Sequence, residues 1–353
     1  MSKLWQKLIR PAMFSLEAER AHKIGIKALQ LGLGGFAQER TEFGELERFG
    51  LKFSSPIGVA AGFDKNGVVV NQLASLGFGF VEVGTVTYDP QAGNPKPRLF
   101  RLPDDNALVN RLGFNNDGAV AVAERLKNLN RQCIVGVNIG RNKDVPNAEA
   151  TDNYLKCFDV MHGVADYVAV NISSPNTPDL RELQKAEYLE ELIGSLQNRN
   201  IAYGAKPLLV KIAPDLSESE IEAIVDIALR FDLAGVIATN TTISRAGLIT
   251  TNVEQIGIGG LSGKPLIRHS TEVISLIHRY SRGKLPIIGV GGVFTAGDAF
   301  EKIAAGASLL QAYTGFVYGG PTFARDINRG LAAILKERGV ETLDEAVGSG
   351  TKV

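Results

Sequence analysis

Asparagine, hydroxyl and lysine side chains recur in this sequence just after short apolar segments. Asn171 ends the segment Tyr167–Asn171, Lys211 lies near the end of Leu208–Ile212, and Lys65 follows a third apolar segment closely. An asparagine side chain donates and accepts hydrogen bonds at once, so converging asparagines suit a flat heterocycle edged with amides and carbonyls. Lysines suit an anion or a ring position where negative charge gathers. The pattern therefore predicts a site for a small, polar, planar molecule.

Glycine-rich turns lie beside these polar positions. Gly291-Gly292 and the stretch Tyr313-Thr314-Gly315 each follow an apolar segment and expose backbone N–H groups, which form the usual phosphate cradle of parallel barrels. Each feature also has an ordinary alternative: Gly291-Gly292 alone is more often a tight turn, the stretch 171–178 has turn-forming composition, and Lys211 alone would be a solvated lysine. Because all fall at the same end of consecutive predicted strands, their coincidence favours a phosphate-bearing cofactor next to the planar substrate.

Histidines and carboxylates are scarce at these positions. None of the four histidines lies at the end of a predicted strand, and Asp64 is the one carboxylate that stands out there. This argues against Ser-His-Asp catalysis, histidine-based metal sites and two-metal chemistry. We therefore expect no metal ion.

The segments that position these side chains alternate with helical stretches. Continuous apolar strands alternating with helices indicate a parallel sheet covered on its outside, and eight such units favour a closed (β/α)8 TIM barrel, an α/β fold. The stretch Ala60–Lys65 lacks the glycine pattern of a dinucleotide-binding fold. The predicted strands are Ile57–Ala60, Phe80–Gly84, Ile134–Asn138, Tyr167–Asn171, Leu208–Ile212, Gly235–Thr239, Ile287–Val290 and Leu309–Ala312. The predicted helices are Val69–Leu76, Ala119–Leu129, Ala186–Leu196, Ser219–Phe231, Pro265–Tyr280 and Ala296–Ala304.

The first 40 residues differ from the rest and predict an amphipathic helical hairpin. Leucine, isoleucine and tryptophan recur at helical spacing between basic residues up to Pro11, which should end the first helix. Ser15 can cap a second helix, and Gly32, Gly34 and Gly35 should end it. Such a hairpin can be an extra helical layer on the domain or a surface that lies on a membrane, and both can hold.

Composition limits the remaining classes. The 353 residues carry 38 basic and 38 acidic side chains, so the net charge of zero argues against a nucleic-acid partner. Two cysteines, Cys133 and Cys157, cannot build a disulfide framework, and we expect both as free thiols, Cys133 on a buried strand. The sequence shows neither an apolar run of about 20 residues nor a signal peptide, so we expect the chain to stay where it is made.

Three rival functions stay open on these residues. A barrel aldolase or isomerase could use Lys65 or Lys211 as a Schiff-base amine, which explains the phosphate turns but not the asparagines. A non-catalytic peripheral membrane module would explain the hairpin but leave the polar ring idle. An FMN barrel acting on uracil in RNA fits poorly with the neutral charge.

Long motifs in the chain resemble the dihydroorotate dehydrogenase family over residues 4–335. The serine in the fourth motif and the N-terminal hairpin resemble the class 2, membrane-associated, quinone-linked branch, whereas soluble class 1 relatives carry a cysteine base and lack the hairpin. The motifs are Ala61-Gly62-Phe63-Asp64-Lys65, Gly93-Asn94-Pro95-Lys96-Pro97-Arg98, Asn110-Arg111-Leu112-Gly113-Phe114-Asn115, Asn171-Ile172-Ser173-Ser174-Pro175-Asn176-Thr177 and Gly259-Gly260-Leu261-Ser262-Gly263.

This resemblance implies oxidation of (S)-dihydroorotate to orotate with FMN as cofactor, a step of pyrimidine biosynthesis. Ser174 would be the base that takes the C5 proton, although a serine is a very weak base and needs a proton acceptor behind it. By resemblance, FMN would contact Ala61, Gly62, Thr85, Asn138, Asn171, Lys211, Thr239, Gly263, Gly292, Tyr313 and Thr314. Dihydroorotate would contact Lys65, Asn110, Arg111, Leu112, Gly113, Phe114, Asn171, Asn176, Asn240 and Thr241.

The resemblance also implies how the reduced flavin is reoxidised. A membrane quinone would enter an apolar tunnel formed by the N-terminal helices, with His22, Arg101 and Tyr313 at its inner end. The expected organisation is a hairpin over residues 1–40 and an FMN-binding barrel over 41–353. The expected protein is a monomer bound peripherally at the cytoplasmic face of the inner membrane.

Overall fold

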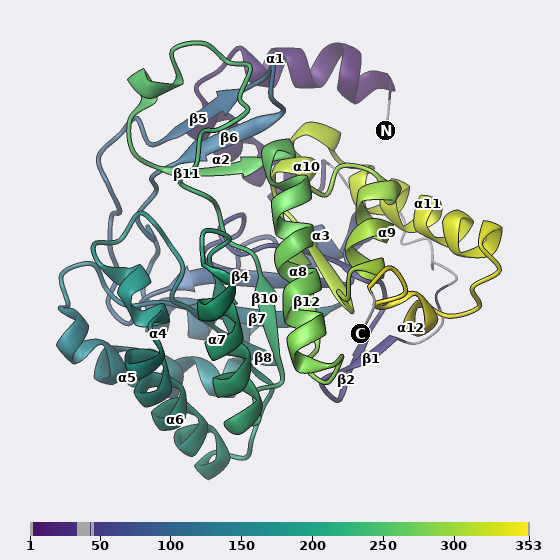
Figure 1. Ribbon diagram of the computed structural model, residues 1–353. Helices are drawn as coiled ribbons and strands as arrows, with labels where there is room; N and C mark the ends of the chain where they lie inside the picture. The colour runs from purple at the N-terminus through teal and green to yellow at the C-terminus, as the bar shows by residue number, and fades with distance from the viewer. Residues whose placement is uncertain (1–2, 34–42, 44–45, 352–353) are drawn as a thin grey trace.

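Eight parallel strands form a closed barrel in the computed structural model, which describes residues 3–33, 43 and 46–351 (Figure 1). The strands follow the order β10-β12-β13-β3-β4-β7-β8-β9, and β9 pairs with β10 to close the ring. All eight predicted strands are confirmed to within two residues at each end. They are β3 (Ile57–Val59), β4 (Phe80–Val86), β7 (Ile134–Ile139), β8 (Tyr167–Asn171), β9 (Leu208–Ile212), β10 (Gly235–Ala238), β12 (Ile287–Val290) and β13 (Leu309–Ala312).

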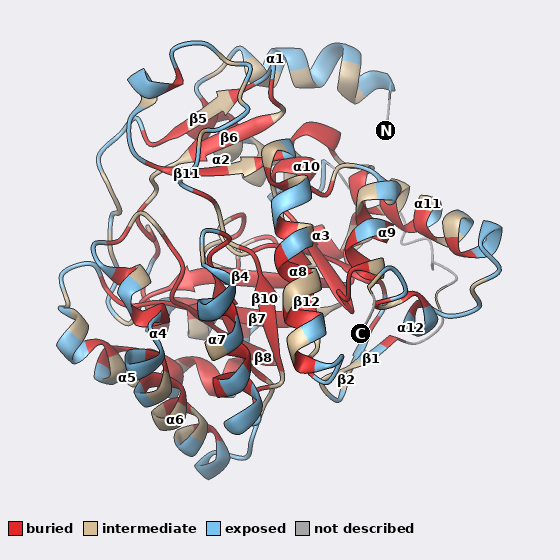
Figure 2. Ribbon diagram, in the orientation of Figure 1, coloured by how far each residue is buried: buried red, intermediate tan, exposed pale blue. Residues whose placement is uncertain are grey.

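The barrel strands read as continuous apolar runs because both of their faces are covered. Every residue of β8 and β9 is buried, and the buried strands form the centre of the molecule in Figure 2. Large rings fill the lower part of the barrel: a Cβ on Gly136 would lie 2.0 Å from the Tyr167 ring. The barrel is thus a packed core, and space for a ligand remains only at its mouth.

Helices cover the outside of the barrel, as the alternation predicts (Figure 1). Capping boxes start two of them, Ser217 with Glu220 and Thr295 with Asp298. Their bounds are α3 (Val70–Ser75), α4 (Ala119–Lys127), α5 (Ala150–Met161), α6 (Ala186–Ala202), α7 (Glu218–Arg230), α8 (Ile267–Ser281), α9 (Ala296–Ala304), α10 (Thr314–Gly319), α11 (Phe323–Glu337) and α12 (Leu343–Ala346). Short 3-10 turns are Asn147–Glu149, His162–Val164, Leu180–Gln184, Val253–Ile256 and Lys264–Leu266.

Two small antiparallel sheets lie outside the barrel and were not predicted. A hairpin of β1 (Leu46–Arg48) and β2 (Leu51–Phe53) packs Phe53 against Phe80 in the barrel, with ring centroids 5.2 Å apart. A three-stranded sheet has the order β11-β6-β5. Its strands are β5 (Leu99–Leu102), β6 (Ala107–Asn110) and β11 (Gly260–Gly263).

The N-terminal hairpin lies beside this three-stranded sheet (Figure 1). The expectation that Pro11 ends the first helix is wrong. Pro11 occupies the first turn of α1 (Arg10–Phe14), where its missing N–H leaves no hydrogen bond of the helix unmade, and a π-helical segment, Trp5–Ile9, precedes α1. Ser15 is not the cap of α2 (Ala18–Gln30) either. The Glu17 carboxylate caps it, accepting from the N–H groups of Glu19 and Arg20.

The hairpin is tied to the barrel by polar contacts as well as apolar ones. Arg98 donates to the Glu19 carboxylate from two nitrogens, each at 3.0 Å, and both side chains are buried. Trp5 donates from its indole to the Tyr318 carbonyl at 3.0 Å. Among the described residues, no helix is both long and apolar enough to cross a membrane. Gly34, Gly35 and the expected boundary at residues 40–41 lie outside the described residues.

The two cysteines are free thiols. Cys133 is only partly buried and lies just before β7 rather than on a strand, because β7 begins at Ile134. Cys157 is buried on α5.

Candidate active site

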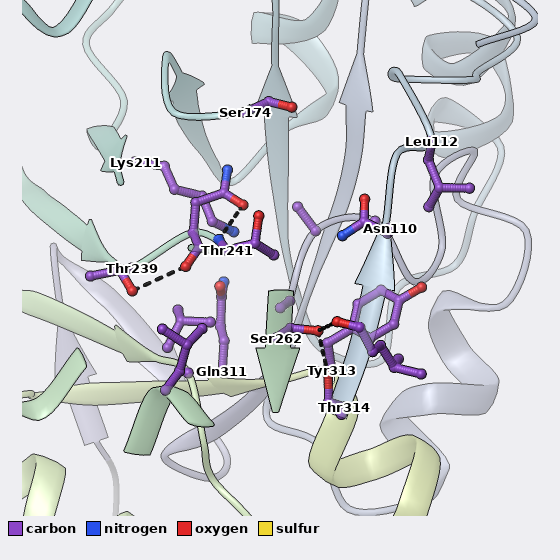
Figure 3. A pocket seen from close by; sticks show the side chains of 18 of the residues that line it. Asn110, Leu112, Ser174, Lys211, Thr239, Thr241, Ser262, Gln311, Tyr313 and Thr314 are labelled. Atoms are coloured by element: carbon purple, nitrogen blue, oxygen red, sulfur yellow. Dashed lines mark hydrogen bonds between the residues drawn. The ribbon is translucent and has the colours of Figure 1, made fainter. Parts of the chain in front are cut away.

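A polar cavity opens at the C-terminal ends of the barrel strands. Asn110, Ser174, Lys211, Thr239 and Tyr313 line it from five different segments of the chain (Figure 3). Of the residues expected to contact the flavin or the substrate, all except Asn138 and Arg111 line this one cavity, and Ser174 lines it too. The barrel thus brings together side chains that lie more than 200 residues apart in sequence.

Amide side chains form a hydrogen-bonded network in the cavity wall. Asn171 donates to the Thr85 hydroxyl at 2.8 Å and to Asn138 Oδ1 at 3.1 Å. Asn176 donates to Asn110 Oδ1 at 3.1 Å, and Asn240 donates to the Ser173 hydroxyl at 2.9 Å. These bonds fix the orientation of each amide, so the groups left facing the cavity are preorganised for a planar ligand.

Asn138 and Arg111 are expected to contact the flavin and the substrate, but neither lines the polar cavity. Asn138 is fully buried beneath Thr85, whose hydroxyl donates to it at 2.5 Å, and it acts on the cavity through that contact. The Arg111 guanidinium donates to the Ile256 carbonyl and lies 4.6 Å from the centre of the Phe100 ring. The Arg111 side chain is thus engaged with the outer loop, and it does not line the cavity.

Glu82, on β4, is a buried carboxylate below the cavity that the sequence analysis missed. It accepts hydrogen bonds from Asn138 at 2.9 Å and from Gln311 at 2.7 Å. It also forms an ion pair with Lys211, with Nζ 3.3 Å from Oε1. An acidic residue in the middle of an otherwise apolar strand was the signal that could have revealed it, since a buried carboxylate must be paired. Glu82 fixes the ammonium of Lys211 at the cavity floor.

Lys65 is the second lysine of the cavity, and its ammonium donates to the Gly62 carbonyl at 2.7 Å. Burial, assisted by the charge of Arg98, lowers the pKa of Lys65 to about 8.

Asp64, the carboxylate that stood out in the sequence, does not line this cavity. It is buried, and its carboxylate accepts hydrogen bonds from the N–H groups of Val68 and Val69 at 2.9 and 2.8 Å. Asp64 therefore shapes the loop that presents Lys65.

Ser174 lies in a loop that several hydrogen bonds hold against the cavity. Its Oγ accepts from the Asn176 N–H at 3.2 Å, and Arg181 bridges the loop by donating to the carbonyls of Ser173 at 3.0 Å and Thr241 at 2.8 Å. In the part of the chain that the structure describes, no histidine or carboxylate hydrogen-bonds to Ser174. The Thr177 hydroxyl, three residues on, is buried without a partner among the described residues.

The glycine turns at one end of the cavity are closely packed. A Cβ on Gly292 would lie 2.6 Å from the N and Cα atoms of Ile267, and a Cβ on Gly315 would lie 1.9 Å from the Val293 carbonyl oxygen. Gly291 and Gly292 both have positive φ, 114° and 75°. Among the described residues, no side chain caps the N-terminus of α8 or of α10. The backbone N–H groups of these turns are candidate donors to an anion.

A second cavity lies between the N-terminal hairpin and the barrel, and its lining is mostly apolar. His22, Arg101 and Tyr313, the three residues expected at a quinone site, all line it, together with Phe14 and Phe63. Arg101 donates to the Leu16 carbonyl at 2.7 Å, which holds the guanidinium at this wall. Tyr313, Leu99 and Leu108 also line the first cavity, so these three side chains lie between the two.

Two titratable side chains of the second cavity, His22 and Tyr313, have pKa values shifted toward their neutral forms. Burial, assisted by the charge of Lys65, lowers the pKa of His22 to about 3, and its ring meets Phe63 edge-on with centroids 5.0 Å apart. Burial and the negative charge of Glu19 raise the pKa of Tyr313 to about 12. Within the described residues no group of three or more metal-ligating side chains could hold a metal ion.

Comparisons with known proteins agree on one family. The sequence model of the family "Dihydroorotate dehydrogenase" matches residues 45–335. A protein named "Dihydroorotate dehydrogenase (quinone)" from Gloeobacter violaceus is 50% identical over 353 residues, covering 97% of this chain and 98% of the relative. One of the same name from Corynebacterium efficiens is 47% identical, covering 96% of this chain and 92% of the relative.

Solved structures extend the likeness to three dimensions. The crystal structure of ligand-free DHODH from Eimeria tenella has a TM-score of 0.89 and 39% identity, and covers 95% of this chain and 100% of that one. The structure of DHODH from Eimeria tenella in complex with ferulenol has a TM-score of 0.87 and 39% identity, over 94% of this chain and 95% of that chain.

Proposed function

The chain belongs to the dihydroorotate dehydrogenase family, and on that premise we propose that its two cavities serve the two halves of one redox reaction. The protein is a quinone-dependent oxidoreductase that oxidises dihydroorotate to orotate in pyrimidine biosynthesis. The observation that supports this assignment best is that Ser174, Lys65 and the asparagine network line the same cavity as the glycine turns.

FMN is the flavin that the residues of the polar cavity fit. The groups of the cavity match the parts of FMN. The buried ammonium of Lys211 can pair with negative charge on the ring, the amides can bond to the ring edge, and the glycine turns leave room for a phosphate that a Cβ would block. Two buried oxygens of the cavity, Gln311 Oε1 and Thr241 Oγ1, lack a partner among the described residues, and a ligand can supply one. When bound, FMN would be the acceptor of the hydride that leaves the substrate. We propose that Ala61, Gly62, Thr85, Asn171, Lys211, Thr239, Gly263, Gly292, Tyr313 and Thr314 hold it directly, with Asn138 acting through Thr85.

Ser174 is proposed as the base toward C5 of dihydroorotate. Its hydroxyl is buried at the cavity wall, and a serine oxygen takes a proton only as its own proton leaves, so it needs an acceptor reached through water. Lys65 lies where it can pair with the substrate carboxylate and stabilise negative charge that grows on deprotonation. Asn110, Asn176, Asn240 and Thr241 would orient the ring, with Leu112, Gly113 and Phe114 packing over it and Arg111 contributing backbone only.

The second cavity is proposed as the quinone site. Its apolar lining suits a hydrophobic ligand, and neutral His22 with Arg101 supplies hydrogen-bond donors for quinone oxygens. The hairpin exposes Leu4 and Leu8 among the basic residues of its first helix, and Leu31 and Leu33 after α2, which supports peripheral binding to a membrane surface. The cytoplasmic face of the inner membrane is the location that we propose. We retain the division into a hairpin over residues 1–40 and a barrel over 41–353, and a monomeric state, as proposals.

Product analysis with Ser174→Ala tests the proposed function. Wild-type protein should form one orotate for each soluble quinone reduced, measured by the ultraviolet absorbance of the two compounds. The variant should keep its flavin yet lose about 99% or more of this turnover, in the range expected for removing a general base. A variant that turns over at the wild-type rate would refute the role of Ser174, and a wild-type protein that forms no orotate would refute the function itself.

A further inference from the structure

Lys302 on α9 is a buried lysine to which the proposed mechanism gives no role. Its side chain is fully buried, and its ammonium donates to Ser270 Oγ at 2.6 Å, to Thr271 Oγ1 at 2.9 Å and to the Ile267 carbonyl at 3.2 Å. All three acceptors are uncharged and belong to the start of α8. The tip of Lys302 therefore lies against the first turns of α8, away from its own helix.

Burying a charged ammonium costs desolvation free energy, and hydrogen bonds to uncharged partners do not fully offset that cost. The carboxylates whose charges act on it, Asp298 and Glu301, are on α9 itself, and neither forms an ion pair with it in the part of the chain that the structure describes. Burial lowers the pKa of Lys302 to about 7, which is the expected response of an ammonium without a close counter-ion. An anion nearby would restore its charged form.

The glycine turn of the proposed cofactor site shares its packing partners with this ammonium. The Ser270 hydroxyl, which accepts from Lys302, is 2.9 Å from the carbonyl oxygen of Gly291. Ile267, whose carbonyl accepts from Lys302, is the residue that a Cβ on Gly292 would strike. Lys302 itself does not line the cavity, whereas Gly291 and Gly292 do, so Ser270 and Ile267 connect its ammonium to the turn that faces an anion.

We propose that Lys302 is a positioning residue for the phosphate of the cofactor: its ammonium provides the positive charge behind the Gly291-Gly292 turn and holds that turn against the start of α8. The inference rests on the proposed FMN site. The N–H groups of the turn bind the phosphate directly, and the charge below raises the affinity of the site for an anion because the packed layer between them screens poorly.

Lys302→Met tests this, because it keeps the length of the side chain and removes the charge. The dissociation constants of FMN and of riboflavin, which lacks the phosphate, are measured on the full chain by flavin fluorescence on dilution and reloading. The expected result is FMN binding weakened about tenfold or more with riboflavin changed by less than about twofold. Equal losses for both flavins, or unchanged FMN affinity, would overturn the proposal, since a merely structural lysine affects both alike.

Lys206→Met is the matched control. Lys206 also donates to backbone carbonyls, those of His162 and Ala165 at 2.6 and 2.7 Å, but lies before β9 at the opposite end of the barrel. Lys206→Met should therefore leave the ratio of FMN affinity to riboflavin affinity at its wild-type value. If Lys302→Met does not fold, Lys302→Gln, which keeps a donor, carries the same expectation, and failure of both to fold would overturn the assigned role. Wild-type protein that binds no FMN would instead refute the proposed function.

Discussion

At the scale of single residues, Glu82 sets the charge of the cavity floor. Its carboxylate is fully buried, pairs with Lys211 and also accepts from Asn138, Tyr167 and Gln311. Removing one partner of a buried ion pair leaves the other charge uncompensated. Glu82 therefore moderates how strongly Lys211 attracts negative charge on a ligand above it.

Glu82→Gln should raise the reduction potential of the bound flavin, because the uncompensated Lys211 ammonium then stabilises the anionic reduced form. A rise of about 30 mV or more for the two-electron couple, which is about 1.4 kcal/mol, is expected in a spectroscopic redox titration. Tyr167→Phe, which removes one hydrogen bond to Glu82 without changing charge, is the control and should shift the potential less. An unchanged potential in Glu82→Gln would contradict the placement of Lys211 beside the flavin.

Lys65 should make orotate binding dependent on pH. Because its pKa is lowered to about 8, the ammonium that pairs with the carboxylate of orotate is present below that pH and lost above it. The dissociation constant of orotate, followed by the change in flavin absorbance, should be constant near pH 6–7 and rise by about tenfold per pH unit above the pKa. Lys65→Met should bind weakly with no such dependence, and a flat wild-type profile would show that Lys65 does not contact the carboxylate.

At the scale of elements, the N-terminal hairpin should serve the membrane rather than the flavin. Leu8→Glu places a charge on a leucine that is 64% exposed, and should reduce sedimentation with anionic vesicles and turnover with a long-chain quinone several-fold while flavin content stays at the wild-type level. Val120→Glu is the matched control, since Val120 is 65% exposed but lies on α4, away from the hairpin (Figure 1).

Deletion of residues 1–40 should lower quinone reduction and vesicle binding more than flavin loading. Equal losses of all three would contradict the separate role of the hairpin, because they would mean that it is simply part of the fold.

The barrel strands could be predicted because they are continuous apolar runs between polar turns, and the runs of β8 and β9 begin and end at the residues where the strands do. The three-stranded sheet could not, because β5, β6 and β11 are four residues each and β11 pairs with β6 across some 150 residues of chain. The same separation explains why the position of the Arg111 side chain could not be predicted: its partner, the Ile256 carbonyl, lies on a segment whose position only the folded chain defines.

At the scale of the whole molecule, two cavities of opposite character meet at Tyr313. The polar cavity lies at the barrel mouth, the apolar one lies under the hairpin, and Tyr313 lines both. In the proposed function, this arrangement keeps the charged substrate and the hydrophobic acceptor apart while each can reach the same flavin, as a reaction with two separate electron-transfer steps requires. Resemblance of motifs could predict which residues line each cavity, whereas the buried supports, Glu82 and Lys302, were visible only once the strands were assembled.

The most direct test of this account is the visible absorbance spectrum of the purified protein before and after anaerobic addition of dihydroorotate, followed by a soluble quinone. The account predicts a flavin band that bleaches with one equivalent of dihydroorotate and returns with quinone. A colourless protein that takes up no FMN, or a flavin band that dihydroorotate leaves unchanged, would contradict it.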